Sequence, residues 1–264
     1  MPSDAVRDHG LSISALTCNG NSLHPGRSGR EHDKVVRKTI ELAPMLGVDR
    51  IVMMSGCPGA PGDRHPNWIT VAWPPEATEI LEWQWKEVLI PYWRKLVRFA
   101  ADKGIKRLCL ELHGGQNVYN VATLMRLREA CGDAVGVNFD PSHLMWMGAD
   151  PIAAIDALGS AVFHVHAKDT LIEARNAAIN SRLETRPSQQ ARERSWNYVT
   201  LGYGHGEEFW RAFCLALRRG GYDGALSIEH EDMALSPMEG VRKSVDLLRR
   251  VYIVEPASYE LPKI

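Results

Sequence analysis

Cysteine is scarce in this sequence of 264 residues, and no pair of cysteines is spaced as Cys-x-x-Cys. The five cysteines, an odd number, are scattered along the chain at positions 18, 57, 109, 131 and 214. This scatter argues against both a disulfide framework and a structural zinc knot. We therefore expect reduced thiols and a cytoplasmic protein.

The sequence also lacks an excess of one charge and any long hydrophobic run. The formal net charge is −1 and the isoelectric point is near 6.8, so there is no basic footprint for nucleic acid. No apolar run approaches the roughly 18 residues that a membrane span needs, and the start, MPSDAVRDHG, is polar and charged. We expect a soluble, untargeted chain with no nucleic-acid or membrane partner.

What the sequence contains is an alternation of short apolar stretches and amphipathic segments. Strands are predicted at residues 11–18, 50–56, 107–114, 135–140, 162–169 and 225–232, with a weaker one at 197–204. Helices are predicted at 31–47, 79–104, 119–133, 207–221 and 238–252. A repeated strand and helix predicts a parallel α/β architecture. With 45% hydrophobic content the chain can bury a large core, and we expect one domain over residues 1–264.

The longest predicted helix, residues 79–104, carries both an apolar face and an internal proline. Pro91 predicts a kink, because proline cannot continue the hydrogen-bond ladder of a helix. The apolar positions step by three and four, so one face is expected in the core; they are Leu81, Trp85, Val88, Tyr92 and Leu96.

Four ionisable residues stand at the carboxyl ends of predicted strands: Glu111, Asp140, His166 and Glu229. A β/α unit takes roughly 30 residues, so the spacing of these four places them on successive strands with the weak strand at 197–204 skipped. In a β/α barrel that end of the strands is the face where sites are built. Because unpaired buried charges are costly, four such groups in an apolar setting favour a metal site.

Alternation along each strand selects the residues that share the site's side. In FHVHAKD, His164, His166 and Lys168 lie on one side, and His166 is nearer the top, so we choose it over His164. The same alternation pairs Glu111 with His113, and Glu229 with Glu231. The alternative for each residue is a structural ion pair or a buried histidine bonded to a carbonyl. In DPSH, the alternative is that Asp140 only starts a turn and His143 is a loop histidine.

Several motifs together resemble the sugar phosphate isomerase/epimerase family, whose barrels are similar to xylose isomerase and the ketose 3-epimerases. The motifs are LCLELHGGQNVYN, VNFDPSHL, HVHAKD, GYGHGEEFW and LSIEHED, and the resemblance covers nearly the whole chain. It implies a TIM (β/α)8-type barrel and one divalent cation bound by Glu111, Asp140, His166 and Glu229. It also implies that His143, three residues after the aspartate, contacts the substrate.

Two features depart from this family. Relatives often have histidine before the Gly-Asn of the GNSLHP loop, where this chain has Asn19. Only seven strands can be counted, and residues 1–10 are too few for a strand and a helix. We therefore expect the first β/α unit to be missing and the strand at 11–18 to have an unpaired edge, either covered by a neighbouring chain or explained by a start codon upstream.

The ligand set indicates the chemistry. Three carboxylates and one imidazole suit Mn²⁺ best, with Mg²⁺, Co²⁺ or Zn²⁺ as alternatives. Such an ion stabilises the enediolate formed when a proton leaves the carbon next to a sugar carbonyl, with Glu111 and Glu229 as the acid and base. His113, His143 and Lys168 are expected to bind substrate. The loop at 57–75 is either a lid that brings Trp68 or Trp73 against the sugar, or a surface loop anchored by both tryptophans.

The predicted function is thus a metal-dependent sugar isomerase or epimerase, and three alternatives stay open. The first is a metal-dependent lyase or C-glycoside-cleaving subunit that acts on a 3-oxo sugar. The second, a trinuclear-zinc DNA repair endonuclease, needs further histidine ligands where this chain has Asn19 and Ser55. The third is a non-catalytic metal-binding partner subunit. We expect a homo-oligomer or a complex with a partner subunit.

Overall fold

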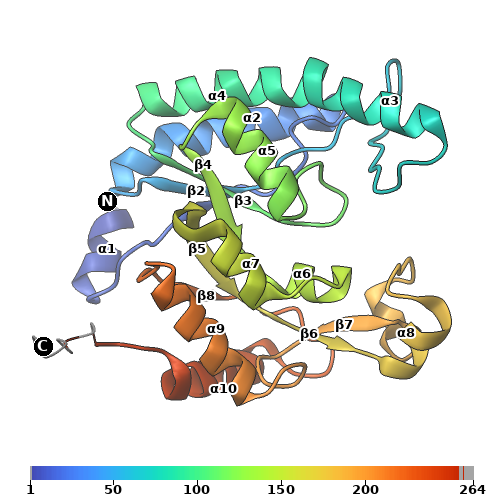
Figure 1. Ribbon diagram of the computed structural model, residues 1–264. Coiled ribbons are helices and arrows are strands. Elements are labelled where there is room, and N and C mark those ends of the chain that lie inside the picture. The colour runs from blue at the N-terminus through green and yellow to red at the C-terminus, as the bar shows by residue number, and fades with distance from the viewer. Residues whose placement is uncertain (1, 256–257, 259–264) are drawn as a thin grey trace, which may run out of the picture.

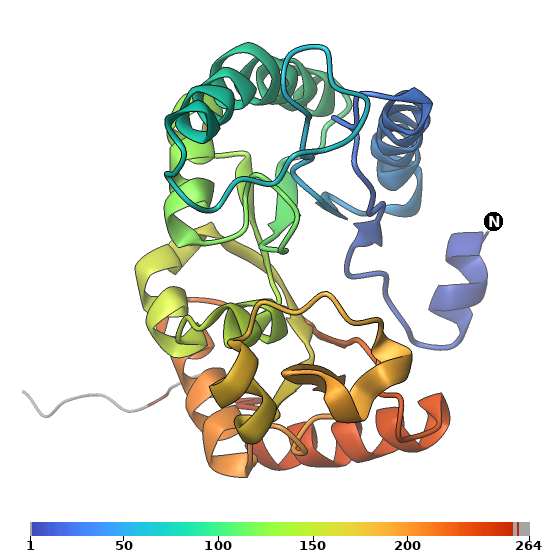
Figure 2. The same cartoon turned by 90° about the vertical axis from the view of Figure 1, so that its right-hand side faces the viewer.

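Six parallel strands form the central sheet of the protein, in the order β1-β2-β3-β4-β5-β8. The structure, a computed structural model, describes residues 2–255 and 258. The predicted parallel α/β barrel architecture is confirmed, as a curled half-barrel (Figures 1 and 2). The strands of this sheet are β1 (Leu16–Thr17), β2 (Arg50–Met53), β3 (Arg107–Glu111), β4 (Val135–Phe139), β5 (Val162–Ala167) and β8 (Leu226–Ile228).

Helices connect the strands and cover the outer face of the sheet (Figure 1). The α-helices are α1 (Pro2–Asp8), α2 (Arg27–Leu42), α3 (Pro75–Trp83), α4 (Ile90–Asp102), α5 (Val121–Cys131), α6 (Pro141–Met147), α7 (Pro151–Leu158), α8 (Ala174–Asn180), α9 (Glu207–Arg219) and α10 (Pro237–Val251). Short 3₁₀ segments lie at η1 (Ala43–Leu46), η3 (Gly159–Ala161) and η4 (Ser188–Glu193), and η2 (Gln84–Leu89) is π-helical. That the whole of 1–264 is one domain remains a prediction, and residues 1, 256–257 and 259–264 of that range lie outside the described residues.

The sheet is open. Among the described residues, β1 pairs only with β2 and β8 pairs only with β5, so each leaves one edge without a strand. The predicted unpaired edge at the first strand is therefore present. Figure 2 shows the resulting arc of strands and helices, with the N-terminal segment on its open side.

The weak strand predicted at 197–204 exists, but it does not belong to the parallel sheet. It is β7 (Trp196–Val199), which pairs antiparallel with β6 (Asp169–Ile172) in a separate two-stranded sheet. The edge of β5 where a seventh strand was expected is instead bonded to β8. Only Lys168 separates β5 from β6, so the chain runs on beyond the top of the sheet before it folds back.

The long helix predicted at 79–104 is present with the predicted irregularity near Pro91. The π-helical η2 runs directly into α4, and Pro91, the second residue of α4, has no N–H to donate to the preceding π turn. Because a π turn adds a residue, the buried face of the helix moves by one position between Trp85 and Leu96. Trp85 and Leu96 are buried as predicted, but Leu89 and Trp93 replace Val88 and Tyr92, which are only partly buried.

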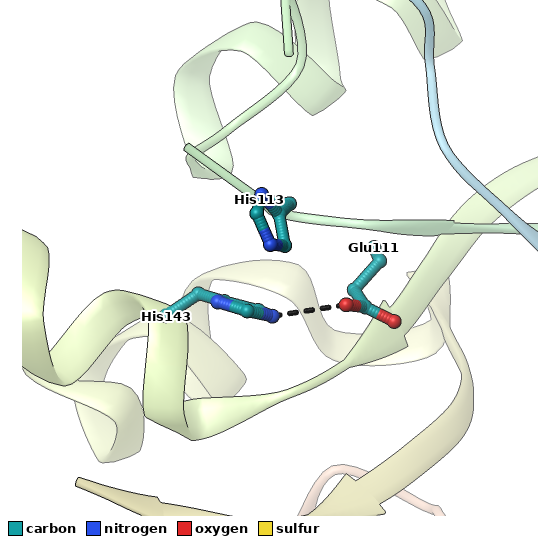
Figure 3. Close-up of side chains that lie close together, drawn as sticks. All are labelled: Glu111, His113 and His143. Carbon is teal, nitrogen blue, oxygen red and sulfur yellow. Dashed lines mark hydrogen bonds and ion pairs between the residues drawn. The ribbon is translucent and has the colours of Figure 1, made fainter. Parts of the chain in front are cut away.

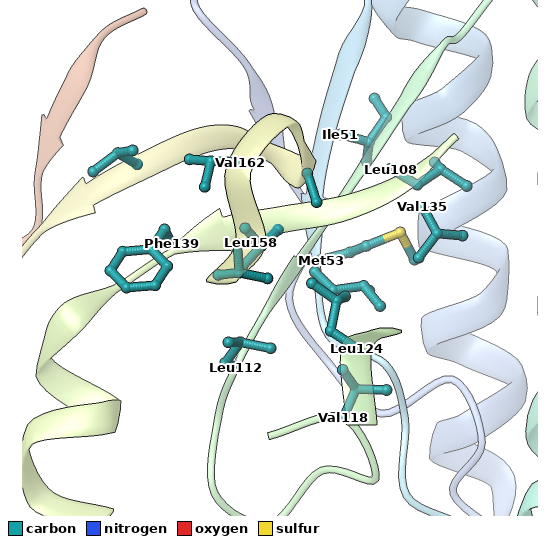
Figure 4. Close-up of a cluster of buried hydrophobic side chains, with 14 of the residues drawn as sticks. Ile51, Met53, Leu108, Leu112, Val118, Leu124, Val135, Phe139, Leu158 and Val162 are labelled. Atoms are coloured by element: carbon teal, nitrogen blue, oxygen red, sulfur yellow. The ribbon is translucent and has the colours of Figure 1, made fainter. Parts of the chain in front are cut away.

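The hydrophobic core fills the space between the sheet and the outer helices (Figure 4). Alternate residues of β3, Leu108 and Leu110, enter this core, which leaves Cys109 and Glu111 on the other, concave side. Gly136 on β4 has no room for a side chain, since a Cβ there would lie 2.4 Å from the ring of Phe163. The packing therefore fixes which residues point toward the site.

Two negative predictions can be compared with the described residues. Across residues 2–255 and 258, no helix is both long and apolar enough to cross a membrane. All five cysteines are free thiols, and four of them are buried. Burial raises the pKa of Cys18 and Cys57 to about 11, so these thiols are poor nucleophiles.

Candidate metal centre

The four predicted ligands meet at the carboxyl ends of the strands. Glu111 is the last residue of β3, Asp140 is the N-cap of α6 directly after β4, His166 lies on β5, and Glu229 follows β8. One ligand atom from each lies within 4.8 Å of the others. The four residues lie close together because parallel strands bring their carboxyl ends to one edge of the sheet.

The possible ligand atoms of this cluster lie close together but do not form hydrogen bonds with one another. Asp140 Oδ2, His166 Nδ1 and Glu229 Oε2 are all buried, and none has a hydrogen-bond partner. His166 Nδ1 lies 2.9 Å from Glu229 Oε2, 3.5 Å from Glu111 Oε2 and 4.0 Å from Asp140 Oδ2. Buried polar atoms are almost always paired, so three buried ligand atoms that lie together without hydrogen-bond partners could hold a divalent ion.

The electrostatics of the cluster keep its carboxylates ionised. Burial disfavours charge on Glu229, but His166 and Lys168 outweigh it and lower its pKa to about 2. Burial likewise opposes ionisation of Glu111, yet the hydrogen bond from His143 and the nearby imidazoles hold its pKa below the usual range. For His166, burial is outweighed by Glu229, Asp140 and Glu111, which raise its pKa.

Lys168 sits among the same carboxylates as a buried cation. Its side chain is 3% exposed, and its Nζ lies 3.2 Å from Glu229 Oε1, 2.8 Å from Glu231 Oε2 and 4.0 Å from Asp140 Oδ2. Burial alone would lower the pKa of Lys168, but Asp140 and Glu229 raise it, so the ammonium stays charged. The sequence placed Glu231 on the same side as Glu229 but did not assign it a role; it is a second partner of Lys168.

His143 lies next to the cluster, fully buried. Its Nε2 is 2.9 Å from Glu111 Oε1, and its Nδ1 is 2.8 Å from the hydroxyl of Tyr198. Figure 3 shows its ring pointing at Glu111, with His113 beside both. Both nitrogens of His143 are thus engaged by protein groups, and its expected contact with substrate remains a prediction.

Glu111, His113 and His143 form a second group whose possible ligand atoms also lie within 4.8 Å of one another. It offers only one carboxylate, and the Nε2 and Nδ1 atoms of His143 already bond to Glu111 and Tyr198. The unpaired donors belong to the four-residue cluster instead. The ring of His113 packs 4.2 Å from that of His143, and burial and His143 lower the pKa of His113, so it is a neutral group beside the site.

His164 takes the structural role that the sequence left open for it. Its Nε2 lies 3.2 Å from Ser227 Oγ, and its Nδ1 accepts the backbone N–H of Val165. Burial lowers the pKa of His164 to about 4, helped by His166, so the ring is neutral. The choice of His166 over His164 as the residue at the ligand cluster agrees with this geometry.

Trp68 and Trp73 have different environments in the loop at 57–75. Trp73 is 75% exposed, so it anchors nothing, whereas Trp68 packs edge-on against Tyr119 with ring centroids 5.6 Å apart. Trp68 also reaches Gly114, beside His113: a Cβ on Gly114 would lie 3.4 Å from its ring. The predicted position of Trp68 near the site is therefore found, and its contact with sugar remains a prediction.

The base of this loop is fixed by a residue that the sequence did not indicate. Gln84, on η2 and fully buried, donates through Nε2 to the carbonyls of Pro58, Gly59 and Asn67 at 3.0, 3.3 and 2.8 Å. Its Oε1 accepts from Asn117. The π turn that displaces the apolar face also places this glutamine under the loop.

The sequence also gave no indication of Tyr198 or of the tryptophans around it. Tyr198 is carried on β7, where its ring lies 5.1 Å from that of Trp196 and 4.1 Å from Lys168 Nζ. Trp196 stacks on Trp146, with ring centroids 4.9 Å apart and planes 8° apart. No sequence motif marked these residues, because β7 was expected inside the barrel rather than beside it.

Comparison with known proteins agrees with this architecture. YfiH of Bacillus subtilis (strain 168), an uncharacterised protein, is 47% identical over 251 residues, which is 94% of this chain and 80% of YfiH. Among solved structures, the 3-keto-D-glucoside 4-epimerase YcjR of E. coli superposes with a TM-score of 0.65 at 17% identity, covering 94% of this chain and 82% of that one. The IolI protein with a bound zinc atom gives 0.60 at 18% identity, covering 95% and 82%.

The match to a protein family is more direct. Residues 3–251 match the family described as xylose isomerase-like TIM barrel, which is nearly the whole described chain. The resemblance seen in the sequence motifs is confirmed, and structural neighbours with that fold act on sugars. This chain belongs to the xylose isomerase-like TIM barrel family.

Proposed function

We propose that the protein is a divalent-metal-dependent isomerase or epimerase, which removes a proton from the carbon next to the carbonyl of a sugar or sugar derivative. The observation that carries the proposal is the set of three buried, unpaired donor atoms on Asp140, His166 and Glu229. Glu111 completes the set. Three carboxylates and one imidazole suit Mn²⁺ best among the common divalent ions, and Mg²⁺, Co²⁺ and Zn²⁺ are compatible.

A cation bound by these four residues would supply a Lewis acid to the substrate carbonyl and its neighbouring hydroxyl. The chain itself supplies the proton transfer. The side chain of Glu229 is 33% exposed, more than any other of the four, so it can reach a substrate while its carboxylate stays ionised. Glu111 is the second carboxylate, and return of the proton to the opposite face gives an epimer, whereas return to the adjacent carbon gives an isomer.

Lys168 and the residues around it complete the proposed substrate site. Its ammonium is held by Glu229 and Glu231 and lies beside the ligand cluster, where it can donate to a substrate oxygen that gains negative charge. His113 is neutral and its Nδ1 faces the carbonyl of Gly114, so Nδ1 carries the proton and Nε2 is left to accept from a sugar hydroxyl. Trp68 is proposed to cover the apolar face of the sugar.

The comparisons support this proposal without establishing it. A structural neighbour is a sugar epimerase and another holds zinc, which favours a sugar reaction and a divalent ion in this chain as well. A lyase that expels a group from a 3-oxo sugar would need the same metal and the same first proton transfer. The product therefore separates the two: an exchanged or rearranged sugar for the isomerase, and an unsaturated sugar for the lyase.

The experiment is proton exchange in D₂O, followed by NMR, with a panel of ketoses and 3-oxo sugars. Protein loaded with Mn²⁺ is compared with chelated protein and with Asp140→Asn, which keeps the shape of the ligand but removes its charge. We expect deuterium at the carbon next to the carbonyl only with the loaded wild type. Exchange that is equal in the chelated protein would refute the metal-dependent mechanism.

We also propose the compartment, the binding partner and the assembly of the protein. Five free thiols favour a reducing cytoplasm, and a small sugar is the expected partner rather than nucleic acid or membrane. The unpaired edges of β1 and β8 favour either a homo-oligomer or a complex with a partner subunit. Sedimentation of the purified protein and of the protein in extract tests these two arrangements.

A further inference from the structure

The hydrogen bonds of His143 define which of its nitrogens carries the proton. Its Nε2 faces Glu111 Oε1 at 2.9 Å, and an ionised carboxylate can only accept. Nε2 must therefore carry the proton and donate it. The hydroxyl of Tyr198 lies 2.8 Å from Nδ1, where it can donate, so in the Nε2–H tautomer both ring nitrogens are paired, Nε2 as donor and Nδ1 as acceptor.

The surroundings of Tyr198 suit a donor. Burial raises the pKa of the Tyr198 phenol, and the nearby Lys168 does not reverse this, so the O–H stays protonated. The two-stranded sheet that carries Tyr198 is tied to α6, because the hydroxyl of Thr170 on β6 donates to the carbonyl of Ser142, 2.9 Å away. Ser142 directly precedes His143, so Tyr198 and His143 are held at a fixed separation.

We propose that Tyr198 is a positioning residue, whose hydroxyl fixes the Nε2–H tautomer of His143 so that His143 holds Glu111 by Oε1 and leaves Oε2 for the cation. This role would explain why the β6–β7 sheet, which lies outside the barrel, carries Tyr198 to the site. Asn138 supports the same orientation, since its Nδ2 donates to Glu111 Oε2 at 3.1 Å, and a carboxylate oxygen that accepts one such bond can still bind a cation. The part of the inference that concerns the cation rests on the proposed function, whereas the part that concerns the tautomer does not.

The tautomer is tested in the metal-free protein. Protein with ¹⁵N-labelled histidine gives a long-range ¹H–¹⁵N spectrum in which the two tautomers differ, and the His143 signals are assigned by their loss in His143→Gln. We expect wild-type His143 to be protonated on Nε2 alone. Tyr198→Phe removes the donor to Nδ1, so the Nδ1–H tautomer should become populated. A wild-type ring protonated on Nδ1, or an unchanged spectrum in Tyr198→Phe, overturns the proposal.

A matched control separates this effect from the loss of any buried tyrosine hydroxyl. Tyr92 donates to Asp33 Oδ1 at 2.9 Å, away from the ligand cluster, so Tyr92→Phe removes an equivalent bond. Tyr92→Phe should leave the His143 signals as in the wild type. If Tyr198→Phe fails to fold, the wild-type spectrum still decides the tautomer by itself.

The second measurement is the affinity for Mn²⁺, read by titration calorimetry. Partners that orient a metal ligand from behind are typically worth about 10-fold to 100-fold in affinity or activity. We expect Tyr198→Phe to weaken Mn²⁺ binding by about tenfold or more and Tyr92→Phe to leave it unchanged. Equal affinity in Tyr198→Phe overturns the positioning role. A wild type that binds no Mn²⁺ refutes the proposed function instead, and the tautomer result stands independently of it.

Discussion

His166 Nδ1 and Glu229 Oε2 lie 2.9 Å apart, yet no hydrogen bond joins them, and neither atom has another partner. Both atoms come from the ends of adjacent strands, β5 and the segment after β8. An imidazole and a carboxylate this close would align as donor and acceptor if pairing were their purpose. The lack of a hydrogen bond at these two atoms, shared with Asp140 Oδ2, is the feature that favours a metal centre over a salt bridge.

Glu229→Gln tests the proposed base. The amide keeps the shape and one coordinating oxygen but cannot take a proton, so turnover should fall by about 10² to 10⁴ while some metal remains bound. The melting temperature of the metal-free protein should fall modestly, because the charge of Glu229 faces His166 and Lys168. Deuterium exchange and metal content are measured on one preparation, with Glu231→Gln as the comparison because Glu231 touches Lys168 but is not a ligand. Undiminished exchange in metal-loaded Glu229→Gln would transfer the role of base to Glu111.

Lys168→Met should act in opposite directions on stability and on metal affinity. Removal of the buried ammonium leaves carboxylates unpaired in the metal-free protein, so its free energy of unfolding should fall by about 2 to 3 kcal/mol. A divalent ion no longer meets a neighbouring positive charge, so it should bind about tenfold more tightly. Chemical denaturation and calorimetry measure both quantities. Lys86→Met is the control, because Lys86 forms an exposed pair with Glu82. Weaker metal binding in Lys168→Met would contradict this account.

The contribution of Glu229 and His166 to the stability of the metal-free protein should be greatest at mildly acidic pH. Glu229 has a pKa of about 2, below its ordinary 4.5, so its contribution is present above about pH 4.5 and is lost as the pH falls toward 2. The pKa of His166 is raised, so its contribution is present below its ordinary 6.5 and is lost as the pH rises through the raised value. Melting temperatures against pH, with His166→Gln for comparison, test this; a wild-type profile that keeps rising above pH 7 would contradict it.

Gln84→Leu tests whether the loop at 57–75 is fixed at its base. The substitution leaves three loop carbonyls without their donor, so unfolding free energy should fall by about 3 kcal/mol. KM for the sugar should rise more than kcat falls, since Trp68 follows Asn67 in the released segment. The exposed Gln189→Leu serves as the control, expected to change stability by no more than about 0.5 kcal/mol. Unaltered stability in Gln84→Leu would show that the loop does not depend on its hydrogen bonds to Gln84.

The sequence was sufficient to group the four candidate ligands and to predict the parallel architecture, and the reason is geometric. Strand ends that follow one another at regular spacing must meet at one edge of a parallel sheet, so Glu111, Asp140 and His166 could be grouped from spacing alone. Alternation along β5 placed His164 and His166 on one side, because the period of a strand is two, and the position of His166 nearer the carboxyl end of the strand separated it from His164.

Features that depend on pairing between distant segments were not predictable in this way. The stretch around Tyr198 reads as a weak strand, and nothing in it shows whether its partner is β5 or β6. The π turn at η2 depends on the whole packing of a helix, so its displacement of the buried face to Leu89 and Trp93 left no local signal. The bonds from Tyr198 to His143 and from Gln84 to the loop follow from these two features.

The most direct test of the metal centre is anomalous diffraction from crystals soaked in Mn²⁺. We predict one peak in each chain, within about 2.0 to 2.3 Å of ligand atoms from Glu111, Asp140, His166 and Glu229. A peak on Glu111, His113 and His143 instead, or no peak among the four residues at saturating Mn²⁺, would contradict the account.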